Sequence, residues 1–65
     1  MLKVLLNEYY VDKKRGFPTV ITLKIENNKV YFKIYADGYL EPKVYNVSEE
    51  LFIEGYELEG RRNEK

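Results

Sequence analysis

The side chains able to do chemistry are few in this chain. It contains no histidine and no cysteine, the residues that most often serve as general acid or base and as activated nucleophile near neutral pH. Apart from tyrosine, its hydroxyls are Thr19, Thr22 and Ser48. Each has a structural role to fill, because threonine is a favoured strand residue and serine a good helix cap. With no glycine-rich phosphate loop either, we expect a protein that is not an enzyme and that uses no cofactor.

Two pairs of carboxylates are the remaining candidates for a chemical site. Glu49 with Glu50, and Glu57 with Glu59, have the groups needed to bind a divalent cation or to share a proton. Acids that alternate with apolar residues are more typical of a solvated strand face. We therefore expect no metal site.

Tyrosines and lysines form the one candidate binding face, because they alternate with apolar residues along the middle of the chain. Such a face can stack bases while neutralising phosphates, or it can form a protein interface. It can also be an ordinary exposed sheet face, since tyrosine is favoured in strands. Its residues are Lys24, Tyr31, Lys33, Tyr35, Tyr39, Lys43 and Tyr45.

Residues 17–47 are expected to position this face as a three-stranded antiparallel meander. Apolar and polar side chains alternate from Val30 to Ala36, the period of two that marks a strand. Asn27 and Asn28 precede this run, and asparagine tolerates the positive φ of a two-residue hairpin turn. The register that this turn sets places Ile21, Leu23 and Ile25 in the core, and Val20 and Thr22 on the tyrosine side.

The second turn of the meander contains Asp37 and Gly38. A two-residue loop there would bring Glu41 and Lys43 into the core. We therefore predict a three-residue loop, residues 36–38, with Gly38 in the left-handed conformation as a bulge.

This bulged loop determines which side chains of the third strand point inward. Leu40 and Val44 enter the core, and Tyr39 joins the tyrosine face. Pro42 would lie beside Phe32. Because proline cannot donate to a ladder, we expect this strand to be an edge or to be irregular at that point.

The segments before the meander are a strand and a charged loop. Residues 2–11 have the composition of a first strand. Lys13, Lys14 and Arg15 come next, in one loop that ends at Gly16. This basic loop is positioned to extend the lysines of the candidate face.

The end of the chain has two interpretations. Ser48 can cap a helix whose first turn is acidic, and Gly55 lies where that helix would have to continue. The first interpretation is a short helical turn near residues 48–51 and then a last strand. The alternative is an α+β fold in which a helix over residues 49–59 packs on a four-stranded sheet. In both, residues 1–60 form a single small domain and residues 61–65 a polar tail.

Together these segments predict an all-β fold: a small five-stranded antiparallel meander, either a barrel or an open sheet. With a one-turn break before the last strand, the arrangement resembles the SH3-like small barrel in outline. The resemblance lies in the architecture and in no sequence motif, so it implies a fold and no function.

Chain length and charge distribution limit further which functions we expect. A chain of 65 residues without cysteine has a small core and no disulfide to support it, which favours a homo-oligomer such as a dimer. Residues 1–35 carry seven Lys and Arg against three Asp and Glu, and residues 36–60 carry one against seven. No segment suits a signal peptide or a membrane span, so we expect a cytoplasmic protein that does not bind membranes.

The function predicted from these observations is that of a non-catalytic interaction module. Its tyrosine and lysine face would bind a protein partner or a second copy of the chain. Nucleic acid, single strand or duplex, is the alternative ligand, disfavoured because the isoelectric point lies below neutral. A third alternative is that the acidic stretch inhibits a nucleic-acid enzyme by imitating a phosphate backbone.

Overall fold

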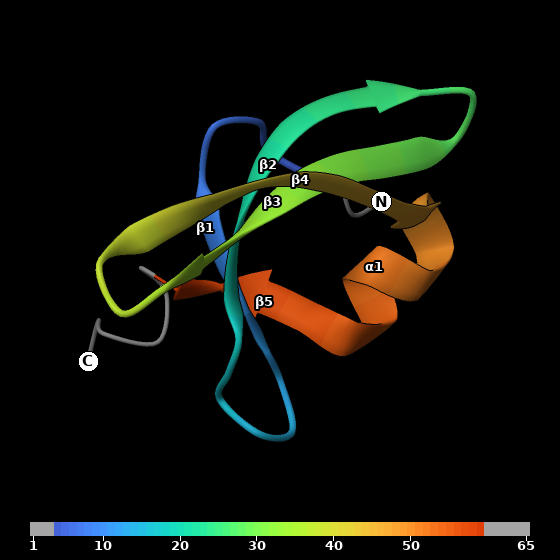
Figure 1. Ribbon diagram of the computed structural model, residues 1–65. Coiled ribbons are helices and arrows are strands. Elements are labelled where there is room, and N and C mark those ends of the chain that lie inside the picture. The colour runs from blue at the N-terminus through green and yellow to red at the C-terminus, as the bar shows by residue number, and fades with distance from the viewer. Residues whose placement is uncertain (1–3, 60–65) are drawn as a thin grey trace.

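The structure, a computed structural model, describes residues 4–59 as five strands and one helix (Figure 1). The elements in chain order are β1 (Tyr9–Asp12), β2 (Thr19–Glu26), β3 (Lys29–Ala36), β4 (Tyr39–Ser48), α1 (Glu49–Gly55) and β5 (Tyr56–Leu58). The predicted tail, residues 61–65, lies outside the described residues.

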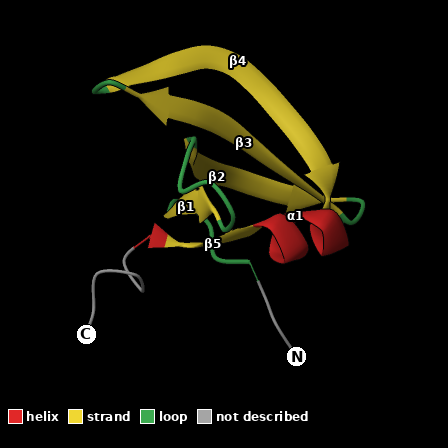
Figure 2. Cartoon of the chain, turned by 90° about the horizontal axis from the view of Figure 1, so that it is seen from below, coloured by secondary structure: helices red, strands yellow, loops and turns green. Residues whose placement is uncertain are grey.

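The strands form one antiparallel sheet in the order β4-β3-β2-β1-β5. The sheet is strongly curved, and α1 connects the end of β4 to β5 across one side of it (Figures 1 and 2). β4 and β5 are its two edges, so it is an open sheet. This confirms the predicted all-β fold with a short helix, in its open form.

The hairpin between β2 and β3 has the predicted two-residue turn. Asn27 and Asn28 both have positive φ, 54° and 64°, and the pairing beside them runs as expected from Glu26 opposite Lys29 to Lys24 opposite Tyr31. Beyond Lys24 the register shifts by one residue.

The shift in β2 reverses which side chains enter the core. It leaves Leu23 as the extra residue, so that Thr22 lies opposite Phe32 and Val20 opposite Ile34. Val20 and Thr22 are buried, and the prediction that Ile21 and Leu23 lie in the core is wrong. The physical reason is that one inserted residue moves every side chain beyond it to the other face of the strand.

The hairpin between β3 and β4 differs from the prediction in its turn. Asp37 and Gly38 form a two-residue loop with φ of 57° and 72°, and Ala36 pairs with Tyr39. The irregularity lies farther along, because Tyr35 pairs with Leu40 while Lys33 pairs with Val44. The three-residue loop at residues 36–38 is therefore wrong.

Pro42 explains where the irregularity falls. It has no N–H to give to the ladder, and it lies in the segment of β4 that does not follow the register. Pro42 is exposed rather than packed beside Phe32. Leu40 and Val44, expected in the core, are 42% and 47% exposed, whereas the prediction of an edge strand with an irregularity is confirmed.

The helix α1 begins after a serine cap and ends at a glycine. The Ser48 hydroxyl accepts a hydrogen bond from the backbone N–H of Leu51 at 3.2 Å, and two acids occupy the first turn, where the helix dipole favours them. The helix extends to Gly55, beyond the turn predicted at residues 48–51. It also ends before the alternative helix over 49–59 would, because β5 pairs with β1.

The core lies on the concave side of the sheet, where α1 contributes Phe52. Aromatic rings make up much of it: the Phe52 ring lies 4.8 Å from Tyr56 and 5.0 Å from Tyr10, between ring centroids. Other buried members are Val4, Val20, Val30 and Phe32. Because this core lies on one side of the sheet, the side chains that alternate with its members along β3 point to the opposite side.

Candidate functional site

The convex side of the sheet, which we call the outer face, is centred on three residues of β3. Tyr31, Lys33 and Tyr35 alternate with Phe32 and Ile34, which pack in the core, so their side chains point away from it. Their cross-strand partners complete the outer face. Its residues are Tyr9, Thr19, Ile21, Lys24, Tyr31, Lys33, Tyr35, Leu40, Val44 and Asn46.

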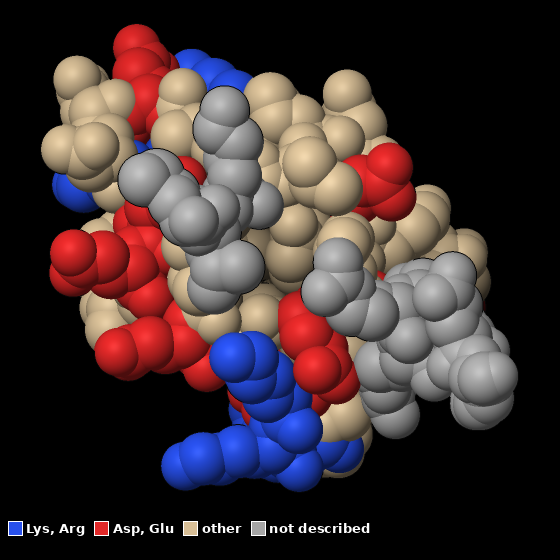
Figure 3. Space-filling model, turned by 180° about the vertical axis from the view of Figure 1, so that it is seen from behind, with Lys and Arg blue, Asp and Glu red and all other residues tan. Residues whose placement is uncertain are grey.

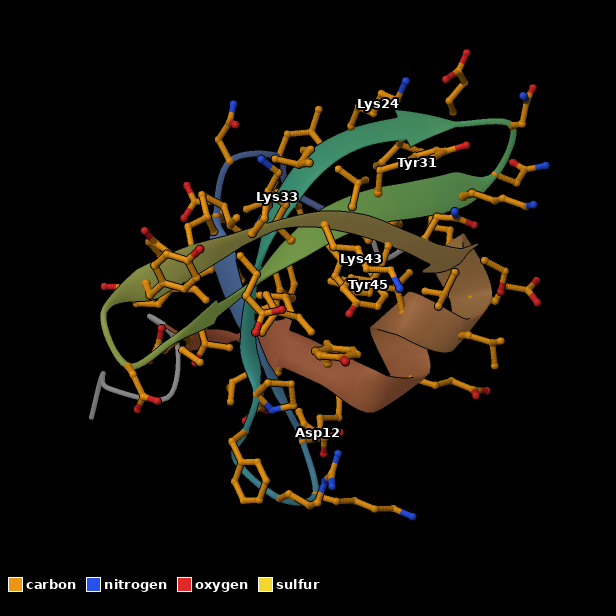
Figure 4. All side chains as sticks on the ribbon, in the orientation of Figure 1. Asp12, Lys24, Tyr31, Lys33, Lys43 and Tyr45 are labelled. Carbon is orange, nitrogen blue, oxygen red and sulfur yellow. The ribbon has the colours of Figure 1, made fainter. Side chains whose placement is uncertain are left out.

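Four of the seven predicted site residues meet on this outer face. Lys24, Tyr31 and Lys33 lie on the same side of the ribbon (Figure 4), and Tyr35 follows in the same alternation. The Lys24 ammonium lies 4.9 Å from the centroid of the Tyr31 ring and 3.0 Å from the Glu26 carboxylate. The hydrogen bond and the negative charge of Glu26 raise the pKa of Lys24, so this lysine stays charged while its charge is balanced locally.

The other three predicted residues lie elsewhere, and the assignment of one common face to all seven is wrong. Tyr45 points to the concave side and stacks on Phe32, with ring centroids 5.9 Å apart. The Lys43 ammonium lies 5.0 Å from the Tyr45 ring, and both residues lie below β4, away from Lys24 (Figure 4). Tyr39 pairs with Ala36, which places it on the side opposite Tyr35.

The outer face contains residues that the sequence analysis missed. Leu40 and Val44 lie opposite Tyr35 and Lys33, and nothing in the alternation signalled them, since both fit a core position equally well. The Tyr9 ring lies 5.4 Å from the Tyr35 ring. The outer face is consequently more apolar than the set of tyrosines and lysines that was predicted.

The basic loop lies between β1 and β2 and is held in a defined conformation. One carboxylate oxygen of Asp12 accepts hydrogen bonds from the backbone N–H groups of Lys14 and Arg15, at 2.9 and 3.0 Å. The Gly16 N–H donates to the Asp12 carbonyl at 2.8 Å. The bond from the Arg15 N–H is the main reason that the pKa of Asp12 is lowered.

The position of this loop argues against one prediction. Figure 4 places Asp12, at the base of the loop, far from Lys24 and Lys33. The basic loop formed by Lys13, Lys14 and Arg15 therefore does not extend the lysines of the outer face.

Among residues 4–59, no group of three acidic, histidine or cysteine side chains is arranged to hold a metal ion. Within the same range, no helix has the length and apolar character needed to cross a membrane.

Comparison with known proteins adds no relationship. No family model, curated protein or solved structure matches the chain.

Proposed function

We propose that this protein is a non-catalytic interaction module that binds protein through the outer face of its sheet, with a second copy of the chain as the occupant. The observation that carries the proposal is the exposure of Leu40 and Val44 beside Tyr31 and Tyr35. Adjacent aliphatic and tyrosine side chains on an open sheet face are the composition that protein interfaces favour.

Two properties of the chain support self-association. A 65-residue chain buries only roughly 60% of its unfolded surface, so burying further apolar area, at about 25 cal/mol per Å², adds substantially to its stability. The ion pair between Lys24 and Glu26 also neutralises one of the cations on this side of the sheet, which lowers the charge repulsion between two such faces.

The test replaces apolar side chains of the outer face with acids. Leu40→Glu and Val44→Glu put a charge into the proposed contact, and each should lower the mass in solution toward the 7.8 kDa of one chain. Sedimentation or light scattering measures this directly. A contact at the centre of an interface is typically worth on the order of 2 kcal/mol, a shift of about 30-fold in the dissociation constant.

Tyr39→Glu is the matched control. Tyr39 belongs to the same strand and is more exposed, at 61%, but it lies on the opposite side of β4 from Leu40. This variant should keep the mass of the unchanged protein. If the unchanged protein is monomeric, or if all three variants behave alike, the proposal is wrong.

Nucleic-acid binding stays the second candidate, supported by the cation–π pair of Lys24 and Tyr31. The arrangement of the cations gives nucleic-acid binding less support than their presence in the sequence does. Lys24 is paired with Glu26, and the basic loop lies away from the outer face. A mobility shift with single-stranded and duplex DNA at low and moderate salt tests it. The acidic-inhibitor alternative and the cytoplasmic location stay predictions.

A further inference from the structure

Two exposed apolar side chains lie on different parts of the surface. One is beside positive charges and the other is beside negative charges. Phe17, 59% exposed, comes after the cations of the basic loop, and Leu51, 62% exposed, belongs to α1. Figure 3 shows blue side chains gathered at the end where the basic loop projects, and red ones gathered on the side of α1. Neither surface belongs to the outer face of the sheet.

The basic loop has a fixed backbone and carries three exposed cations. The hydrogen bonds to Asp12 hold its backbone, and the Arg15 guanidinium lies 5.1 Å from the centroid of the Phe17 ring. No carboxylate in residues 4–59 forms an ion pair with Lys13, Lys14 or Arg15. The loop thus presents an aromatic ring and three cations on a backbone that has little conformational freedom left to lose on binding.

The exposed side of α1 is the complement of this loop. Glu50 and Glu54 are one helical turn apart and therefore neighbours, and Leu51 lies beside them. Phe52, buried in the core, fixes the rotation of the helix and so keeps these three side chains outward. Within residues 4–59, neither glutamate forms an ion pair.

We infer that the basic loop of one copy docks on the exposed side of α1 in a second copy. Phe17 packs against Leu51, while the cations of the loop meet Glu50 and Glu54. The argument for a second copy is charge complementarity: a chain with zero net charge presents both halves of the contact, each an apolar side chain beside charges of one sign. A nucleic acid would satisfy the loop and leave the α1 surface unused.

The contact joins two different surfaces, so each chain in a pair retains one free loop and one free helix. Such contacts form rings or open chains, and pairs related by a two-fold axis only if both contacts close at once. No residue of the outer face takes part, so this inference and the proposed function stand or fall separately.

Charge reversal tests the contact in a background that lacks the outer-face association. All variants therefore carry Val44→Glu. One adds Lys13→Glu and Lys14→Glu, the other adds Glu50→Lys and Glu54→Lys, and their masses are measured by light scattering at low salt. Each reversed protein alone should be monomeric, since its loop and helix then repel. An equimolar mixture should regain association, because each reversed surface meets an oppositely charged one.

The controls separate this contact from general charge effects. Lys29→Glu with Lys43→Glu changes the net charge as much as the loop reversal does but lies outside the loop, and it should leave association in place. Phe17→Ser removes the apolar anchor without a charge change, and we expect it to weaken association by at least about 10-fold. Raising the salt should dissociate the Val44→Glu parent, because exposed ion pairs are screened.

Three results would overturn the inference. They are a mixture of the two reversed proteins that stays monomeric, a loop reversal that associates as well as its parent, and a single-stranded oligonucleotide that binds the parent through the loop while no self-association is detected. Circular dichroism of each variant verifies that it is folded.

Discussion

Thr22 has a buried hydroxyl whose hydrogen bonds join two segments of the chain. Its hydroxyl donates to the Leu5 carbonyl at 2.6 Å and accepts from the Glu8 N–H at 3.3 Å. A buried hydroxyl costs free energy unless it is hydrogen-bonded, and here the segment before β1 supplies the partners. Thr22 therefore ties that segment to the middle of the sheet.

Thr22→Val should destabilise the protein although it keeps the shape of the side chain. The substitution leaves the Leu5 carbonyl and the Glu8 N–H without this partner, so we expect a loss of about 1–3 kcal/mol in the free energy of unfolding. Urea denaturation measures it. Thr19→Val is the control, since Thr19 lies on the outer face, and it should change the free energy of unfolding by less than about 0.5 kcal/mol. Equal effects of the two substitutions would show that the hydrogen bonds of Thr22 contribute nothing.

At the residue scale, the sequence predicted part of the candidate site. Tyr31, Lys33 and Tyr35 were placed correctly relative to Phe32, because strand alternation depends only on the neighbouring residues. Val20 and Thr22 were placed on the wrong side. Leu23 is as apolar as Ile21, so the pattern held no sign that one of them was an extra residue.

At the scale of the elements, one of the two hairpin turns could be predicted from the sequence. Asn27 and Asn28 adopt the positive φ that a two-residue hairpin turn requires, and this turn could be predicted from the residue types. The register beyond it could not. Leu40 and Val44 were misplaced because the turn before them was predicted with three residues instead of two. The irregularity that Pro42 signalled in β4 inserts two residues, so it leaves the side chains on either side of it on the same face.

The same substitution at two glycines should have opposite effects. Gly38 has φ of +72° in the turn between β3 and β4, where a Cβ atom is strained, so Gly38→Ala should lower the free energy of unfolding by about 1–2 kcal/mol. Gly55 is the last residue of α1, and a Cβ atom added there would meet open space. Gly55→Ala should therefore raise the free energy of unfolding by about 0.5–1 kcal/mol. Thermal and urea unfolding report both. A stabilising Gly38→Ala would refute the two-residue turn.

At the scale of the whole molecule, ionisation of Tyr56 should lower the free energy of unfolding at alkaline pH. Burial is the main cause that raises the pKa of this tyrosine, and the negative charge of Asp12 adds to it. The unfolded chain therefore loses the proton first, at a pH of about 10. From there upward the unfolded state binds fewer protons than the folded state, so the free energy of unfolding falls as the pH rises.

Tyr56→Phe removes the ionising group and keeps the ring that stacks on Phe52. Urea midpoints measured between about pH 9 and 11 should fall less steeply in this variant than in the unchanged protein. Parallel pH profiles would mean that Tyr56 does not contribute to the alkaline loss.

On the scale of the molecule, the curved sheet separates two kinds of surface. The concave side is used by the core and α1, and the convex side presents Tyr35, Leu40 and Val44. An antiparallel sheet and a short helix could be predicted from the sequence, because strand alternation and a helix cap are local features, whereas a barrel and an open sheet both fitted the sequence. The composition of the outer face depended on the one-residue register shift between β2 and β3 and on the two-residue turn between β3 and β4, and neither was predicted.

The outer face is tested most directly by recording amide NMR spectra of the labelled protein at increasing concentration. High salt, about 0.5 M, screens contacts between charged surfaces and leaves an apolar contact in place. We predict that signals of Tyr31, Lys33, Tyr35 and Val44 shift together as the protein associates, while those of Phe52 and its neighbours in the core stay unchanged. Outer-face signals that do not move at any concentration up to about 1 mM, a weak limit for a specific contact, would contradict the proposal.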